Sequence, residues 1–202
     1  MVIGIDLDEV LCPTLSYHCR FLNEKYASKG LNLSPCDFHA YEFDTVYGAT
    51  KEQATIDWLQ FCQTHGFRDM NPFPDAFPIL QRLRELRPLH VITSRQNSLR
   101  EQTLSWINKY FSGIFSKVNF GNLYSFDGEV IRKLDLCRRN GVELLVEDDT
   151  RHAIEVAREI PVVLFTKTWN IGFIETGNVV RAKTWEEIEE KIKSLFIQSS
   201  QS

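Results

Sequence analysis

Two carboxylates separated by one residue follow the first apolar stretch of the chain. Asp6 and Asp8 come directly after residues 2–5, a run of strand length that is rich in β-branched side chains. Residues two apart on a strand share a face, and a turn after Asp6 would also bring both side chains to the strand's end. Such a pair repels itself unless it stays solvated, shares a proton or binds a cation. The spacing therefore predicts a catalytic or cation-binding pair, with a solvated strand end as the alternative.

Two later apolar runs also end in polar clusters. Residues 89–92 lead into Thr93 and Ser94, and residues 142–146 lead into a second group of acids. This second group consists of Glu147, Asp148 and Asp149. Because ligands bind at the carboxyl ends of the strands in an open parallel sheet, we expect all three clusters to meet at one edge.

The predicted edge combines the groups that a metal-assisted phosphoryl site needs. Carboxylates from two strand ends suit Mg²⁺ better than Zn²⁺, because no nearby cysteine or histidine accompanies them. The hydroxyl and backbone N–H groups at Thr93 and Ser94 can donate to phosphoryl oxygens, and a cation would complete that anion site. Lys133 is the candidate cation, unless it lies on a solvated helix face beside Arg132. Arg95 either contacts the substrate or is a surface arginine at a helix entry.

The elements that must position these residues alternate between strand and helix. Apolar spacing predicts helices over 13–30, 51–65, 75–87, 98–110, 129–140, 150–159 and from 184 onward. Apolar runs predict strands over 2–6, 89–92, 118–120, 142–146, 161–165 and 179–180. This order indicates an α/β fold, a Rossmann-like doubly wound parallel sheet with right-handed crossovers. No strand pattern separates residues 13 and 70, so this block is predicted to be a small helical insertion after the first strand.

Composition limits the kinds of partner that we expect. The chain has 202 residues, 43% of them hydrophobic and 25% charged, with a net charge of −4. This balance gives no global attraction to nucleic acid or to an anionic membrane. Five cysteines without a CxxC pair favour reduced thiols. No signal peptide or uninterrupted apolar span is evident, so a cytoplasmic location is predicted.

Taken together, these motifs resemble those of the haloacid dehalogenase-like (HAD) hydrolase superfamily. Residues 6–11 match the superfamily's first motif, DxDx[TV][LV], and the other motifs follow in order at Thr93, at Lys133 and at residues 147–149. The resemblance implies a core domain of residues 1–12 and 71–202, with residues 13–70 as a helical cap. One departure is Glu147, which stands where the fourth motif often has glycine.

The resemblance also implies a role for each motif residue. Asp6 would be the nucleophile that forms an aspartyl-phosphate, and Asp8 would be the general acid and then the general base. Thr93 and Lys133 would hold the transferred group. Ser94 and Arg95 would contact the substrate. Mg²⁺ would be bound by the Asp6 carboxylate, the backbone carbonyl of Asp8 and Asp148, with Asp149 or Glu147 as possible substitutes for Asp148. Because Asp8 is present, dehalogenation is disfavoured.

A narrower resemblance concerns the substrate. The helical cap, the sequence Thr93-Ser94-Arg95 and the Trp169-Asn170 loop resemble those of 5'(3')-deoxyribonucleotidases. We therefore expect a Mg²⁺-dependent phosphomonoesterase that acts on a nucleoside monophosphate. The alternatives are a phosphatase of another small phosphorylated metabolite, such as a sugar phosphate or phosphoglycolate, and a catalytically silent relative that binds a phospho-ligand or a protein. A group of aromatics would either fill the cap core or stack on a base. This group consists of Tyr41, Phe43 and Tyr47.

Overall fold

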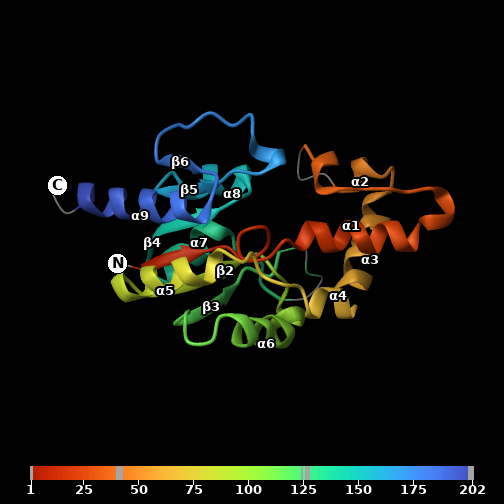
Figure 1. The fold of residues 1–202 in the computed structure, drawn as a ribbon, viewed down its shortest axis with the longest axis horizontal. Helices are drawn as coiled ribbons and strands as arrows, with labels where there is room; N and C mark the ends of the chain where they lie inside the picture. Colours follow the sequence, from red (N-terminus) through yellow and green to blue (C-terminus); the bar gives the residue numbers. More distant parts are fainter. Residues whose placement is uncertain (1, 40–42, 124, 126–127, 200–202) are drawn as a thin grey trace.

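The structure is built around a sheet of six parallel strands. The computed structural model describes residues 2–39, 43–123, 125 and 128–199. The strands are β1 (Val2–Ile5), β2 (Leu89–Thr93), β3 (Lys117–Phe120), β4 (Val142–Glu147), β5 (Val162–Phe165) and β6 (Val179–Ala182). Their order in the sheet is β3-β2-β1-β4-β5-β6, and all neighbouring pairs are parallel (Figure 1). The α/β doubly wound fold is thereby confirmed.

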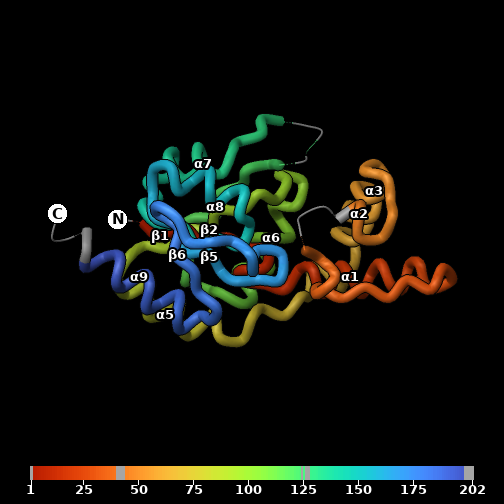
Figure 2. Tube along the Cα trace, turned by 90° about the horizontal axis from the view of Figure 1, so that it is seen from above, coloured from red at the N-terminus to blue at the C-terminus, as the bar shows by residue number. Residues whose placement is uncertain are grey.

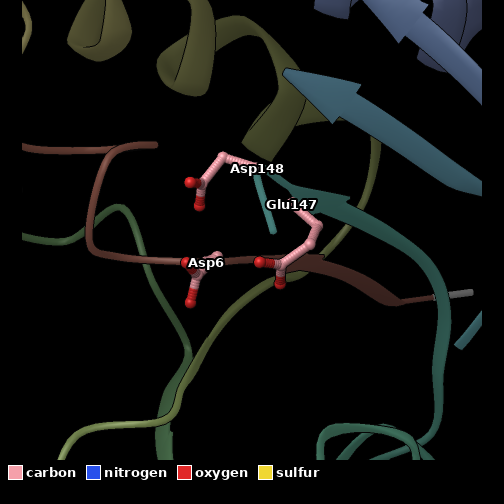
Figure 3. A group of neighbouring side chains, drawn as sticks. All are labelled: Asp6, Glu147 and Asp148. Carbon is pink, nitrogen blue, oxygen red and sulfur yellow. The ribbon is translucent and has the colours of Figure 1, made fainter. Parts of the chain in front are cut away.

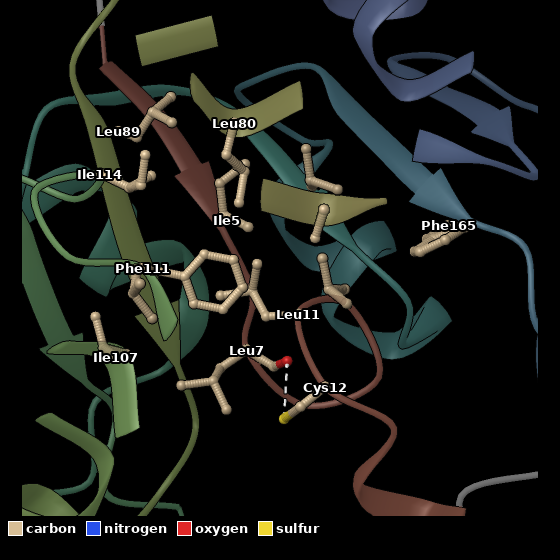
Figure 4. Close-up of a cluster of buried hydrophobic side chains, with 14 of the residues drawn as sticks. Ile5, Leu7, Leu11, Cys12, Leu80, Leu89, Ile107, Phe111, Ile114 and Phe165 are labelled. Carbon is tan, nitrogen blue, oxygen red and sulfur yellow. Dashed lines mark hydrogen bonds between the residues drawn. The ribbon is translucent and has the colours of Figure 1, made fainter. Parts of the chain in front are cut away.

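Helices cover both faces of this sheet. Those of the sheet domain are α5 (Ala76–Leu86), α6 (Arg100–Tyr110), α7 (Lys133–Arg139), α8 (Thr150–Val156) and α9 (Trp185–Ser199). Helices α7 and α8 lie on one side of the strands, and α5 and α9 lie on the other (Figure 2). The second face holds the larger apolar cluster, in which Ile5, Leu80 and Phe111 are buried (Figure 4). Strands covered on both faces read as continuous apolar runs, which is why the sequence predicts them well.

The register of the central strands brings the motif residues to one edge. Ile5 at the end of β1 pairs with Val91 of β2 and with Val146 of β4. The backbone N–H of Asp6 donates to the Val146 carbonyl at 3.0 Å. The order of strands along the sheet reverses beside β1, since β2 and β3 lie on one side of it and β4 to β6 on the other. A ligand site is expected at such a switch point.

Residues 13–39 and 43–70 form a helical segment beside the carboxyl edge of the sheet, on the right in Figure 1. Its elements are α1 (Thr14–Lys25), η1 (Ala27–Lys29), η2 (Pro35–Asp37), α2 (Phe43–Val46), α3 (Lys51–Cys62) and α4 (His65–Arg68). Within the described part of this segment, no residue joins the six-stranded sheet. The described part of the helical segment thus contributes no strand to the sheet.

A buried carboxylate links the helices of the helical segment. Asp57 on α3 accepts from Lys25 of α1 at 2.5 Å and from the Tyr47 hydroxyl at 2.8 Å. It also accepts from the side chains of Tyr26 and Gln53. In this structure the Tyr47 hydroxyl is therefore engaged in the hydrogen-bond network around Asp57. Tyr41 and the Phe43 side chain, which were grouped with it, lie outside the described residues.

Several predicted helix boundaries are wrong. Helix α7 begins at Lys133 rather than at residue 129, because Arg132 has an extended backbone (φ −63°, ψ 151°). The Ser98–Glu101 pair does not start α6, which follows a 3₁₀ turn (η3, Asn97–Leu99). The helix over 51–65 is interrupted before Thr64, whose side chain caps α4. None of the helices in the described ranges combines the length and apolarity that crossing a bilayer requires.

Candidate active site

Three buried acids meet where β1 and β4 end. Asp6 follows β1, Glu147 is the last residue of β4, and Asp148 comes next in the chain. Each offers one carboxylate oxygen, and these oxygens all lie within 4.8 Å of one another (Figure 3). The predicted convergence of the first and fourth motifs is therefore present in the fold.

Lys133 connects two of these acids. Its Nζ donates to Asp6 Oδ1 at 2.7 Å and to Glu147 Oε2 at 2.6 Å, and its side chain is only 2% exposed. The alternative of a solvated lysine is wrong, because Lys133, the first residue of α7, is buried and paired with Asp6 and Glu147. Glu147, which departs from the motif pattern, is thus the second partner of the lysine.

Burial and neighbouring charge set the protonation of this group. Burial, together with repulsion from Glu147, raises the pKa of Asp6 to about 7, although Lys133 opposes the change. Burial also acts to raise the pKa of Glu147, but Lys133 and His152 together outweigh it and lower that pKa to about 2. The two carboxylates keep Lys133 charged by raising its pKa despite burial. The site thus holds more negative charge than its lysine neutralises.

The donor set fits a hard cation. All three acids supply oxygen, the ligand atom that Mg²⁺ prefers. Both oxygens of Glu147 already accept hydrogen bonds, one from Lys133 and one from the Asp149 backbone N–H at 3.0 Å. This engagement favours Asp6 and Asp148 as metal ligands over Glu147. Additional positive charge beside Asp6 would offset the repulsion that raises its pKa.

Asp149, the remaining acid of the fourth motif, is engaged elsewhere. It caps α8, accepting from the Arg151 backbone N–H at 2.8 Å, and it pairs with the Arg151 guanidinium at 2.6 Å. An N-cap carboxylate that also pairs with a cation is explained by helix stability. Asp148 therefore remains the first choice in this motif.

Asp8 lies in a separate polar group beside the acid cluster. The Arg95 guanidinium pairs with both of its oxygens, at 3.0 Å and 2.7 Å, and the Thr14 hydroxyl donates to it at 2.5 Å. Although burial opposes it, Arg95 keeps the pKa of Asp8 below its usual value. Arg95 is itself buried and lies 4.6 Å from the ring centroid of Phe67 on α4. It is therefore no surface arginine, and in this structure its partner is Asp8.

Thr93 and Ser94 occupy the predicted anion-binding end of β2. Thr93 is fully buried, and its hydroxyl oxygen accepts from the Arg95 backbone N–H at 3.2 Å. The hydroxyl proton of Thr93 can still be donated to a ligand. Ser94 is half-buried, and its carbonyl accepts from Leu123 at 3.0 Å. Because Ile5 pairs with Val91, both residues lie at the end of β2, at the same edge of the sheet as Asp6.

Two site residues were missed by sequence reasoning. Glu9 has a left-handed backbone (φ 61°), is buried, and accepts from the Leu15 N–H of α1 at 2.5 Å. Burial raises the pKa of Glu9 to about 7. Lys167 follows β5, with Nζ 4.2 Å from the ring centroids of both Phe73 and Phe165. Neither the acid after Asp8 nor an isolated lysine gives a local pattern that would reveal these contacts.

Comparison with known proteins identifies the family. The family model described as "5' nucleotidase, deoxy (Pyrimidine), cytosolic type C protein" matches residues 1–198. No curated protein sequence matches the chain.

Solved structures share the fold at low sequence identity. A haloacid dehalogenase-like family hydrolase from Streptococcus pneumoniae is 14% identical, with a TM-score of 0.66 over 96% of this chain and 97% of that one. A predicted phosphoglycolate phosphatase from Haemophilus somnus is 16% identical, with a TM-score of 0.64 over 95% and 97%. The magnesium-bound YfnB of Bacillus subtilis is 10% identical, with a TM-score of 0.60 over 95% and 98%.

The family match covers nearly the whole chain, including every motif residue described above, and the fold agrees with it. The chain therefore belongs to the 5' nucleotidase, deoxy (Pyrimidine), cytosolic type C family, and it is a HAD-type phosphatase, a hydrolase of phosphoric monoesters.

Proposed function

We propose that this phosphatase hydrolyses a nucleoside monophosphate, with Mg²⁺ and an aspartyl-phosphate intermediate. The observation that carries the proposal is the buried group of Asp6, Lys133 and Asp148 at the switch point of the sheet. The family description, a deoxy pyrimidine 5' nucleotidase, supports the substrate class. Family membership also argues against the catalytically silent alternative.

In the first half of the reaction, Asp6 would attack the phosphorus through one carboxylate oxygen. The bond from phosphorus to the ester oxygen breaks, and the leaving oxygen takes a proton from Asp8. Thr93 and Lys133 donate to the transferred group, whose charge is greatest at its oxygens. The products of this half are the nucleoside and the aspartyl-phosphate.

In the second half, a water molecule would attack the phosphorus of the intermediate. The Asp8 carboxylate takes the proton of this water, and the bond between Asp6 and phosphorus breaks to release phosphate. In the structure Asp8 is a carboxylate paired with Arg95, which is the form suited to this base step. For the acid step Asp8 must take up a proton and give up a bond to Arg95.

Asp6 and Asp148 would hold Mg²⁺, together with the backbone carbonyl of Asp8. When bound, the ion would screen the phosphoryl charge from the nucleophile and polarise the phosphoryl oxygens. Ser94 and Arg95 remain proposed substrate contacts, with Arg95 available only when its pairing with Asp8 loosens.

We also propose that residues 13–70 act as a cap over a core of residues 1–12 and 71–202. Two contacts support this proposal: Arg95 lies against the Phe67 ring, and the Thr14 hydroxyl donates to Asp8. A cytoplasmic location is proposed on the family's description as a cytosolic type.

Phosphate release from a panel of substrates tests the proposal. The panel contains deoxyribonucleoside 5'-monophosphates, phosphoglycolate, a sugar phosphate and an aryl phosphate, each assayed with Mg²⁺ and with EDTA. We expect Mg²⁺-dependent turnover that is fastest on the nucleotides and abolished in Asp6→Asn. Asp135→Asn, a change at a half-buried acid of α7 that pairs with Arg132, is the matched control and should retain activity. Turnover by Asp6→Asn equal to wild type would overturn the nucleophile, and preference for phosphoglycolate would overturn the substrate class.

A further inference from the structure

The turn after β5 is firmly attached to the sheet domain. This turn, η4 (Thr168–Asn170), is held by the Asn170 side chain. The Asn170 amide N–H donates to the carbonyls of Asp148 and Phe165, both at 2.8 Å. Its amide oxygen accepts from the Lys167 backbone N–H at 3.0 Å and from Arg181 at 3.1 Å. Because Asn170 is buried and multiply bonded, the turn presents its neighbours at a fixed place beside Asp148.

One of these neighbours contacts the acid cluster itself. The indole Nε1–H of Trp169 donates to Asp148 Oδ2 at 3.0 Å. Asp148 is only 1% exposed, so water has little access to compete for this oxygen. A carboxylate with one oxygen bonded to a donor on a rigid turn loses rotational freedom, and its second oxygen is held in one direction as a result.

The same side chain contacts the helical segment. The Trp169 ring packs against an apolar cluster from that segment, whose members are Leu15, Cys19, Leu33, Phe38 and Val46. The adjacent Thr168 hydroxyl donates to the Pro35 carbonyl at 3.2 Å. Trp169 thus touches the acid cluster with its polar edge and the proposed cap with its apolar surface.

We propose that Trp169 is a positioning residue that orients Asp148 for metal binding and links its orientation to the seating of the helical segment. The inference rests on the proposed function, in which Asp148 is a Mg²⁺ ligand. Its physical basis is that a metal ligand held by an outer hydrogen bond loses no further freedom on binding. Removing such an outer partner lowers metal affinity by about 10–100-fold.

Calorimetric titration of the metal-free full-length protein with MgCl₂ tests this role without any reliance on turnover. Trp169→Phe keeps an aromatic ring against the cluster but removes the N–H, so we expect its Mg²⁺ dissociation constant to rise by about 10-fold or more. Trp58→Phe removes an indole elsewhere in the helical segment and should leave the constant within about twofold of wild type, since no contact with the acids is lost.

A second variant separates the two contacts of the indole. Trp169→Ala removes both the N–H and the ring, so it should weaken Mg²⁺ binding at least as much and also lower the melting temperature below that of Trp169→Phe. A merely structural role would change the melting temperatures and leave the Mg²⁺ affinity of Trp169→Phe unaltered, which would overturn the inference.

The wild-type titration distinguishes failure of the role of Trp169 from failure of the proposed function. If wild type and Trp169→Phe bind Mg²⁺ with equal affinity, the positioning role of Trp169 is overturned and the proposed function stands. Wild type that binds no Mg²⁺ overturns the metal dependence in the proposed function, and this inference with it. Mg²⁺-dependent change of tryptophan fluorescence in wild type, lost in Trp169→Phe, would support the indole's position beside the metal.

Discussion

Replacement of Lys133 by methionine gives the most direct test of the buried charge group. Methionine retains the length and most of the volume of lysine but removes the ammonium group. Asp6 and Glu147, whose side chains are 8% and 1% exposed, would then lie together without their shared cation. The variant should therefore lose stability in the absence of metal, independently of any loss of activity.

The size of this loss follows from the burial of the partners. Removing one member of a buried ion pair costs about 3–5 kcal/mol, because the remaining charge stays buried and unpaired. Domains are stable by only about 5–15 kcal/mol, so the change is large enough to measure easily. Protonation of Asp6 or Glu147 can reduce this loss of stability, because it removes one of the unpaired charges. Burial and Glu147 already raise the pKa of Asp6 to about 7, and without Lys133 this pKa should rise further.

The pH dependence has a definite sign. When an acid has a higher pKa in the folded protein than in the unfolded chain, the folded form binds more protons, and stability falls as pH rises between the two values. The unfolded value for Asp6 is 3.8 and the folded value is about 7. Wild type and Lys133→Met share this fall up to about pH 7, because Asp6 keeps its proton in both folded proteins below that value. We therefore expect the deficit of Lys133→Met that comes from Asp6 to grow as pH rises above about 7, toward the higher pKa of Asp6 in the variant. Mg²⁺ should restore part of it, since a ligand at 100 times its dissociation constant stabilises by about 2.7 kcal/mol.

Urea denaturation of wild type and Lys133→Met, in EDTA and in saturating Mg²⁺, tests these expectations. Run at pH values from below to above the Asp6 pKa of about 7, it measures the loss of stability, its dependence on pH and its recovery with Mg²⁺. Arg132→Met is the matched control, because the neighbouring Arg132 side chain is 66% exposed and pairs only with surface acids, Asp135 and Glu155, in the described structure. Exposed pairs contribute about 0–1 kcal/mol, so this control should lose little. Equal losses in the two variants, or a deficit of Lys133→Met that does not change with pH, would refute the reasoning.

Three further predictions concern other charged groups. Asp8→Asn should slow nucleotide hydrolysis by about two to four orders of magnitude but affect an aryl phosphate less, because a good leaving group needs no proton; equal losses on both substrates would remove Asp8 as the acid. Arg95→Lys keeps the charge but cannot pair with both oxygens of Asp8, so kcat/KM on nucleotides should fall about tenfold while melting changes little; wild-type kinetics would show that the two-bond pairing is dispensable. Glu189 pairs with Arg82, which lowers its pKa to about 2. The stability that Glu189 contributes is fully present above 4.5, the pKa of Glu189 in the unfolded chain, and is lost as pH falls toward its folded pKa. Glu189→Gln should therefore lower the free energy of unfolding by about 1 kcal/mol at pH 7 and by less at pH 3. An equal loss at both pH values would count against this pairing.

The parts of the fold that the sequence predicts are those with local causes. β4 and β2 are mainly apolar runs, interrupted by Glu143 and His90, that end in polar residues, and both strands lie where the pattern places them. The parallel arrangement then brings Asp6 beside Glu147 without any further information. For this reason the meeting of the first and fourth motifs could be predicted from the order of strands and helices alone.

The parts that the sequence does not predict depend on contacts between distant residues. Arg95 and Asp8 are separated by 87 positions, and no local pattern distinguishes a buried bidentate arginine from one at the surface. Helix α7 begins at Lys133, four residues beyond the predicted start at 129, because the backbone of Arg132 is extended, and Lys133 is buried by its contacts with Asp6 and Glu147. Trp169 stands in a short turn whose place is set by the Asn170 side chain rather than by a helical or strand period.

The hydrogen bonds of the site divide its acids into two groups. Asp6 and Glu147 are linked by Lys133, and all three of these residues belong to the sheet domain. Asp8 and Asp148 differ from these residues, because Asp8 is bonded to a residue of the helical segment and Asp148 is bonded to a residue that packs against it. Asp8 accepts from Thr14 at the start of α1, and Asp148 accepts from Trp169, whose ring lies in the segment's apolar cluster. A change in the seating of the helical segment would therefore reach the proposed acid–base residue and one proposed metal ligand, while the nucleophile and its lysine keep their geometry. In the proposed mechanism, the helical segment is therefore bonded to the acid–base residue and to a neighbour of one metal ligand, whereas the nucleophile is bonded to Lys133 of α7.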